Sequence, residues 1–92
     1  MLHRASFLET GDRPIVIIHV THQQLLDEVA CLRLRRNLRR ALGGLEVILR
    51  CRSPHGIRFH ADEHLRHHAM DPEIDTLPVV TLDVDGVVAQ AA

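Results

Sequence analysis

Residues 14–20 form the segment that most constrains the fold of this chain. They read Pro-Ile-Val-Ile-Ile-His-Val, with apolar side chains at odd and even positions alike. Successive side chains of a strand point to opposite faces, so this strand has no face suited to water. Strands of this kind lie inside sheets that are covered on both sides. The segment therefore predicts an α/β domain with a packing layer on each face of its sheet.

The chain length of 92 residues suits a single small domain. We expect residues 1–13 to be irregular, because they carry no sustained period and lead into a turn signal at residues 10–14. No apolar run approaches the ~20 residues of a membrane span, and no basic start leads into an apolar stretch as in a secretory signal. All eleven basic residues are Arg, which a GC-rich coding bias explains. We therefore expect a cytoplasmic protein of bacterial type that does not associate with membranes.

Residues 22–42 have the pattern of one amphipathic helix. Thr21 and Gln24 match a capping box at its start, and the Gly pair that follows Leu42 ends it. At 3.6 residues per turn, one stripe of this helix faces the core. That stripe consists of Ala30, Cys31, Leu34, Leu38, Ala41 and Leu42. The arginines of the helix fill the opposite side, namely Arg33, Arg35, Arg36, Arg39 and Arg40.

A second apolar stripe runs along the arginine side of this helix. It consists of Leu25, Val29 and Leu32, spaced about one helical turn apart. An apolar stripe on a polar face needs a cover, such as the N-terminal segment or a second copy of the chain. We therefore predict an interface at these three residues, with a homo-oligomer or another protein as the partner.

The remaining segments predict short strands and one further helix. A strand is expected over residues 45–52, a turn over 53–56, and a short extended piece over 57–60. A helix is expected over residues 61–70, ended by Asp71 and Pro72. A strand over residues 78–84, an Asp-Gly turn at 85–86 and a return strand over 87–89 complete the order.

The segment from Thr76 to Val88, Thr-Leu-Pro-Val-Val-Thr-Leu-Asp-Val-Asp-Gly-Val-Val, resembles the region around the cis-proline of thioredoxin-like and glutaredoxin-like proteins. The resemblance implies a thioredoxin-like β-α-β-α-β-β fold with a cis bond before Pro78. It does not extend to the chemistry of that family, because residues 20–24 between the first strand and its helix contain no cysteine. The alternative architecture is ferredoxin-like βαββαβ, with residues 45–52 and 57–60 as a hairpin.

Charge is distributed unevenly along the chain. Residues 1–60 hold ten Arg and five acids, or +5, whereas residues 61–92 hold one Arg and seven acids, or −6. Such a chain can pair internally or associate head to tail. Three arginines of the helix, Arg33, Arg36 and Arg40, are candidates for anion binding. Nucleic acid is not favoured as a partner, because no aromatic side chain lies among these arginines to stack on bases.

Five of the eight histidines fall between residues 55 and 68. His60, His64, His67 and Asp71 would share one face if a continuous helix carried them. Imidazole and carboxylate groups at this spacing can bind Zn²⁺, so these four residues are the candidate metal site. The alternative is a solvated helix face opposite Ala61, Leu65 and Ala69. Clustered imidazoles could also make such a helix sensitive to pH.

Few other residues suggest chemistry. Cys31 and Cys51 fall on predicted core faces, where thiols usually serve as small apolar groups. His19 is expected to be a hydrogen-bonded histidine near a strand end. No pattern of a hydrolase triad or phosphate loop is visible, so catalysis is not favoured and no cofactor other than Zn²⁺ is suggested.

The sequence therefore predicts a thioredoxin-like domain without the redox motif that acts as a protein-binding or self-assembly module. The alternatives are a protein that responds to metal or pH through a His-rich helix and a degenerate thiol redox protein.

Overall fold

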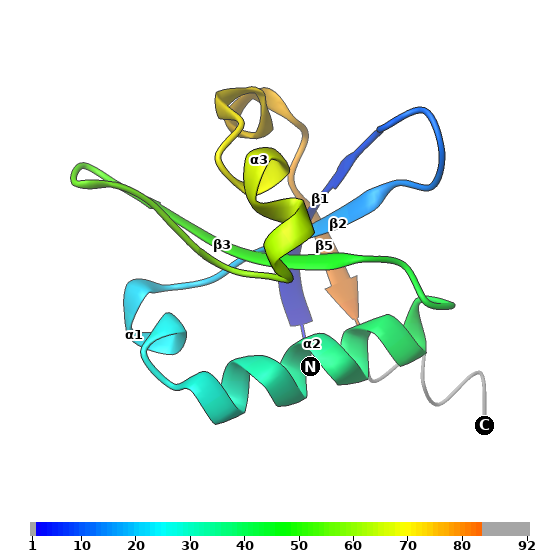
Figure 1. Cartoon of the computed structure of the whole chain (residues 1–92), viewed down its shortest axis with the longest axis horizontal. Helices are drawn as coiled ribbons and strands as arrows, with labels where there is room; N and C mark the ends of the chain where they lie inside the picture. Colours follow the sequence, from blue (N-terminus) through cyan, green and yellow to red (C-terminus); the bar gives the residue numbers. More distant parts are fainter. Residues whose placement is uncertain (1, 84–92) are drawn as a thin grey trace.

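A computed structural model describes residues 2–83 of the chain. It contains one five-stranded sheet with the strand order β4-β3-β2-β1-β5 (Figure 1). Strands β2 and β3 are parallel, and the other three neighbouring pairs are antiparallel. The strands are β1 (Leu2–Leu8), β2 (Ile15–His19), β3 (Val47–Ser53), β4 (Gly56–His60) and β5 (Val80–Asp83).

Helices cover both faces of this sheet. The helical segments are α1 (His22–Leu25), α2 (Glu28–Ala41), η1 (Glu63–Leu65), α3 (Arg66–Ala69) and η2 (Pro72–Thr76), the two η segments being 3₁₀ turns. The helices α1 and α2 lie on one face, and η1, α3 and η2 lie on the other (Figure 1). None of the helices described in residues 2–83 is long and apolar enough to cross a membrane.

Strand β2 is buried on both faces, as its composition predicts. Val16 and Ile18 belong to the core beneath α2, and Ile15 and Ile17 belong to the core beneath α3. None of the four is more than 5% exposed. This confirms the mixed α/β class and the two packing layers.

The expectation that residues 1–13 are irregular is wrong for residues 2–8, whereas residues 9–13 lie in neither helix nor strand. Residues Leu2–Leu8 form β1, which pairs with β2 from Arg4 opposite His19 to Leu8 opposite Ile15. The other edge of β1 pairs with β5. Because polar and apolar residues are mixed along β1, its strand character comes from pairing with two neighbours rather than from its own pattern.

The single helix predicted over residues 22–42 is divided in two. The capping box of Thr21 and Gln24 is present, but α1 ends at Leu25. Asp27 then adopts an extended conformation and caps α2, its Oδ1 accepting from the backbone N–H of Ala30 at 3.0 Å. The sequence contains one signal for the start of α2 at this point, because Asp27 belongs to the residue types preferred as N-caps. The helix ends at Ala41, before the Gly pair, as predicted.

The helix predicted over residues 61–70 is confirmed only in part, because a 3₁₀ turn and a short α-helix occupy residues 63–69. His60 is the last residue of β4, and the chain turns through η1 before the four-residue helix α3. The reason is that Asp62 is extended and is held by an arginine of α2, so the helix cannot begin at residue 61. The hairpin of β3 and β4, expected in the ferredoxin-like alternative, is present.

The strand expected over residues 78–84 is present as β5, which covers Val80–Asp83. The Asp-Gly turn at 85–86 and the return strand over 87–89 lie outside the described residues. No cis peptide bond occurs in residues 2–83, so the bond before Pro78 is trans and the cis expectation is wrong.

A buried arginine joins the second helical layer to the sheet. The guanidinium of Arg50, on β3, is 1% exposed. Its Nε donates to the carbonyl of Ala69 at 2.9 Å, and its NH1 donates to Asp75 Oδ1 at 2.8 Å. Arg52 also pairs with Asp75. These hydrogen bonds lower the pKa of the Asp75 carboxyl, chiefly through the bond from Arg50. The hydrogen bonds of Arg50 attach α3 and η2 to β3, which matters because these short segments make few apolar contacts.

We expect Asp75→Asn to destabilise the fold by about 2–3 kcal/mol, because it leaves the buried Arg50 guanidinium without its counter-charge. Urea unfolding at neutral pH measures the change. Glu73→Gln, on the same 3₁₀ turn but exposed, is the matched control and should cost less than about 0.5 kcal/mol. Equal stabilities of the two variants would contradict the role given to Asp75.

Candidate binding surface on helix α2

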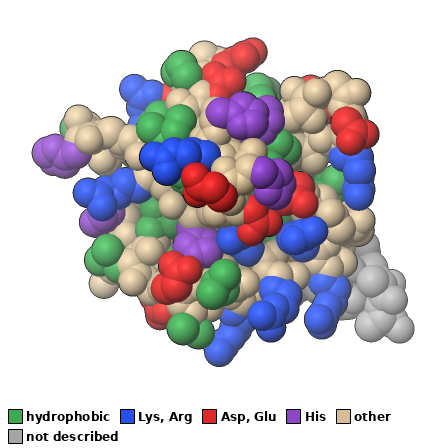
Figure 2. Space-filling view, viewed as in Figure 1, with side chains coloured by type: hydrophobic (Ala, Val, Ile, Leu, Met, Phe, Trp, Pro, Cys, Tyr) green, Lys and Arg blue, Asp and Glu red, His purple; other side chains and the backbone are tan. Residues whose placement is uncertain are grey.

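Helix α2 presents one face to the core and leaves a long face to solvent. Cys31 and Leu38 are buried against β2 and β3 and fix its rotation on the sheet. The solvent face carries apolar side chains near its start and arginines toward its end. Figure 2, viewed as Figure 1, shows the arginines along the lower edge of the molecule, over α2.

Three apolar side chains are exposed between the end of α1 and the middle of α2. Leu26 is 69% exposed, Val29 is 64% exposed and Leu32 is 47% exposed. Leu25, predicted as part of this stripe, instead packs against the core. The turn between α1 and α2 rotates Leu25 inward and Leu26 outward. The apolar stripe of the structure is thus Leu26, Val29 and Leu32, which we call the apolar ridge.

Three arginines beside the apolar ridge have no acidic neighbour. Arg33, Arg36 and Arg40 are exposed, and no carboxylate of residues 2–83 lies within ion-pair distance of them. Elsewhere the uneven charge of the chain is paired internally, because Asp62 binds Arg35 and Asp75 binds Arg50. Arg33, Arg36 and Arg40 are therefore part of the positive charge that this pairing leaves unneutralised.

Arg35 is buried, unlike the other arginines of α2, so the prediction that it lies on the solvated face is wrong. It is 7% exposed. Its NH2 donates to Asp62 Oδ1 at 2.7 Å, and its NH1 donates to His60 Nδ1 at 3.2 Å. The bond from Arg35 lowers the pKa of the Asp62 carboxyl. Only the tertiary structure brings β4 and η1 to this side of α2.

His60 is fully engaged by this contact. A guanidinium can only donate, so Nδ1 of His60 accepts, and its Nε2–H donates to Glu28 Oε1 at 2.9 Å. This arrangement suits the neutral imidazole, with both ring nitrogens in use. His60 therefore links β4 to α2 and has no lone pair free for a metal ion.

The other members of the predicted metal site do not join His60. His64 lies 3.8 Å from Glu46 Oε2, His67 stacks on His68, and Asp71 accepts from the backbone N–H of Glu73. In residues 2–83, no group of three His, Cys, Asp or Glu side chains is arranged to hold a metal ion. The Zn²⁺ site expected at His60, His64, His67 and Asp71 is not assembled, because the continuous helix it required is absent.

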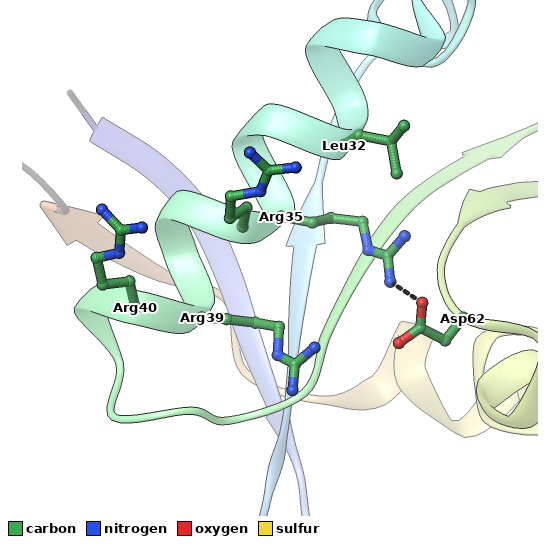
Figure 3. A pocket seen from close by; sticks show the side chains of 6 residues that line it. Leu32, Arg35, Arg39, Arg40 and Asp62 are labelled. Atoms are coloured by element: carbon green, nitrogen blue, oxygen red, sulfur yellow. Dashed lines mark hydrogen bonds and ion pairs between the residues drawn. The ribbon is translucent and has the colours of Figure 1, made fainter.

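A hollow opens between α2 and η1. It has a volume of about 410 Å³ and is lined by Leu32, Arg35, Arg36, Arg39, Arg40 and Asp62 (Figure 3). Arg35 and Arg39 extend from α2 toward the side where Asp62 lies (Figure 3). Of the three arginines predicted to bind anions, Arg36 and Arg40 line the hollow and Arg33 does not. Arg35 and Arg39 also line the hollow but were not among the arginines predicted to bind anions, since their position depends on the placement of Asp62.

His19 is hydrogen-bonded at the end of its strand, as predicted. Its Nε2 lies 2.8 Å from Ser6 Oγ on the neighbouring strand β1. Burial lowers the pKa of His19, and the nearby charges of Arg4 and Arg50 lower it further. Ser6 is fully buried, so this pair offers no accessible nucleophile. Its role is to satisfy two polar groups inside the sheet.

The two cysteines occupy different environments. Cys31 is buried and its thiol donates to the carbonyl of Gln24 at 3.3 Å, whereas Cys51 is half-buried. Burial raises the pKa of the Cys31 thiol, and the charge of Glu28 raises it further. Both cysteines are free. Cys31 is therefore a core side chain, as predicted, and is poorly suited to redox chemistry.

These features define a mixed α/β protein with an apolar and basic helix face. Comparisons with protein-family models, with curated proteins and with solved structures found no match.

The two cysteines should differ in thiol reactivity because their environments differ. Cys51 should react with an aromatic disulfide reagent in the native protein, and Cys31 should react only after denaturant is added. The Cys51→Ser variant should lose the native phase, and Cys31→Ser should keep it. A fast native reaction that survives in Cys51→Ser would favour the redox alternative.

Asp62→Asn should make the fold less stable by about 1 kcal/mol at neutral pH, the scale of a partly exposed ion pair. Because the fold lowers the pKa of Asp62, this contribution is present above the ordinary Asp pKa of about 3.9 and is lost as the pH falls below it. Unfolding curves from neutral to acidic pH should therefore converge for the variant and the wild type. A difference that persists unchanged in acid would contradict the ion pair.

Proposed function

We propose that this protein is a self-assembly module that dimerises through the exposed face of α2. The observation that supports this most directly is the apolar ridge of Leu26, Val29 and Leu32. Large apolar side chains seldom gather on the surface of a monomer without a binding role. A second copy of the chain offers an identical apolar ridge, which suits the self-complementary contact of a twofold dimer.

Charge favours an antiparallel arrangement of the two α2 helices. Asp27 and Glu28 lie at the start of α2, and the unpaired arginines follow the apolar ridge toward its end. In a parallel pair, arginines would face arginines. In an antiparallel pair centred on the apolar ridge, the Arg33 and Arg36 region of one protomer lies beside the acidic start of α2 in its partner. The helix dipoles also oppose each other in this orientation.

Neither alternative function gains the same support. The proposed thioredoxin-like relationship adds no reaction, because Thr21, His22 and Gln23 occupy the junction where that family carries its cysteines. A metal-responsive helix would need the four-residue site that the described chain does not assemble. The apolar ridge requires neither a cofactor nor a nucleophile.

We expect Val29→Asp to raise the dimer dissociation constant by at least about tenfold, since it puts a charge into an apolar contact. Sedimentation velocity over a concentration series measures the change. Val79→Asp is the matched control, because Val79 is also exposed, at 46%, but lies far along the chain beside β5. The control should dimerise as the wild type does.

Salt provides a second readout. The wild type should be dimeric at low and at high salt, because an apolar contact is not screened. A monomer at both salt concentrations would contradict self-assembly. A dimer found only at low salt would show association by charge alone and would contradict the role of the apolar ridge.

A further inference from the structure

The hollow between α2 and η1 collects positive charge in a concave place. Four guanidinium groups and one carboxylate line it, so its formal charge is 4 − 1 = +3. Among residues 2–83, the one other residue that lines it is Leu32. A concave surface of one charge sign concentrates its field and attracts ions of the opposite sign.

A buried donor of Arg35 has no partner among residues 2–83. The side chain of Arg35 is 9% exposed, and its NH1 and NH2 are used by His60 and Asp62. Its Nε is buried and makes no hydrogen bond within the described residues. Because this atom is closed off from solvent, Arg35 contributes its positive charge to the hollow rather than a hydrogen-bond donor.

The other arginines of the hollow retain free donors. Arg36 and Arg40 have no carboxylate partner in residues 2–83. Arg39 is 44% exposed and makes one contact, from NH2 to Glu46 Oε1 at 3.3 Å. Each guanidinium carries five N–H donors in a planar fork, which matches the spacing of phosphate or carboxylate oxygens. The hollow therefore offers several guanidinium donors and few acceptors.

We propose that this hollow is a binding site for the phosphoryl group of a small phosphorylated molecule. Arg36, Arg39 and Arg40 supply charge-assisted hydrogen bonds, and Arg35 adds its positive charge beside them. A phosphate dianion matches the surplus charge better than a single carboxylate does. The volume of about 410 Å³ falls within the range of small-molecule sites and leaves room beyond one phosphoryl group. No aromatic residue lines the hollow, so it has no stacking surface for a nucleobase.

Asp62 serves as a positioning residue in this site. Its ion pair with Arg35 holds that guanidinium beside the hollow. His60 supports the same arrangement from β4. The carboxylate also limits the positive charge to a level that one dianion can neutralise closely.

This site adjoins the proposed dimer contact and shares Leu32 and Arg36 with it. Val29 belongs to the apolar ridge and does not line the hollow. The Val29→Asp variant should therefore lose self-association and keep anion binding. The failure of one proposal is in this way distinguishable from the failure of the other.

Inorganic pyrophosphate, titrated into the protein at low ionic strength and followed by backbone amide NMR, tests the site. We expect saturable shifts confined to residues 32–40 and to the region around Asp62. Arg36→Gln and Arg40→Gln should each weaken binding about tenfold, the scale of a lost charge-assisted hydrogen bond. Arg33→Gln is the matched control, since it removes the same charge from the same helix outside the hollow, and should change affinity less than twofold.

Inorganic phosphate and chloride at matched ionic strength complete the experiment. Phosphate should bind more weakly than pyrophosphate at the same residues, and chloride should produce no saturable shift. Equal losses in Arg33→Gln and Arg36→Gln would show attraction to the whole helix and overturn the site. Absence of saturable shifts with pyrophosphate in the wild type would overturn it as well.

Discussion

Burial of β2 on both faces is the constraint from which the rest of the architecture follows. Its residues Ile15 to Ile18 are removed from water, so the sheet needs a helical layer on each side. On one side α2 meets this need with a long amphipathic helix. On the other side only α3 and the turns beside it are available, and they contribute Leu65, Ala69 and Ile74. The second layer is short, so apolar contact alone fixes it weakly.

Electrostatic contacts compensate for the shortness of that layer. Arg50 extends from β3 into it and is held by backbone carbonyls and by Asp75. Arg35 extends from α2 and is held by Asp62 and His60. In both cases an acid from the C-terminal part of the chain meets an arginine from the N-terminal part. The charge asymmetry of the sequence is thus used within the fold, between segments that are distant along the chain.

This internal pairing also explains why α2 is the surface on which function is proposed. Arg33, Arg36 and Arg40 have no carboxylate partner in residues 2–83. The break at Asp27 leaves Leu26 exposed near the exposed Val29 and Leu32 in the sequence. A helix that continued from residue 22 would have placed these groups differently. The local break thus shapes the apolar ridge, and the ion pair of Arg35 with Asp62 shapes the hollow.

The sequence by itself determined the features that depend on neighbouring residues. These are the two-faced strand β2, the capping box of Thr21, the end of α2 before its Gly pair and the tight turn between β3 and β4. Only the tertiary structure decided that β1 is a strand, that His60 ends β4 instead of starting a helix, and that Arg35 is buried. Each of these depends on a partner far along the chain: β2 for β1, α2 for His60, and Asp62 for Arg35. Local propensity and hydrophobic periodicity depend on residues that are close together in the sequence. Hydrogen bonds and ion pairs across the fold depend on residues that are far apart in the sequence, so no local pattern predicts them.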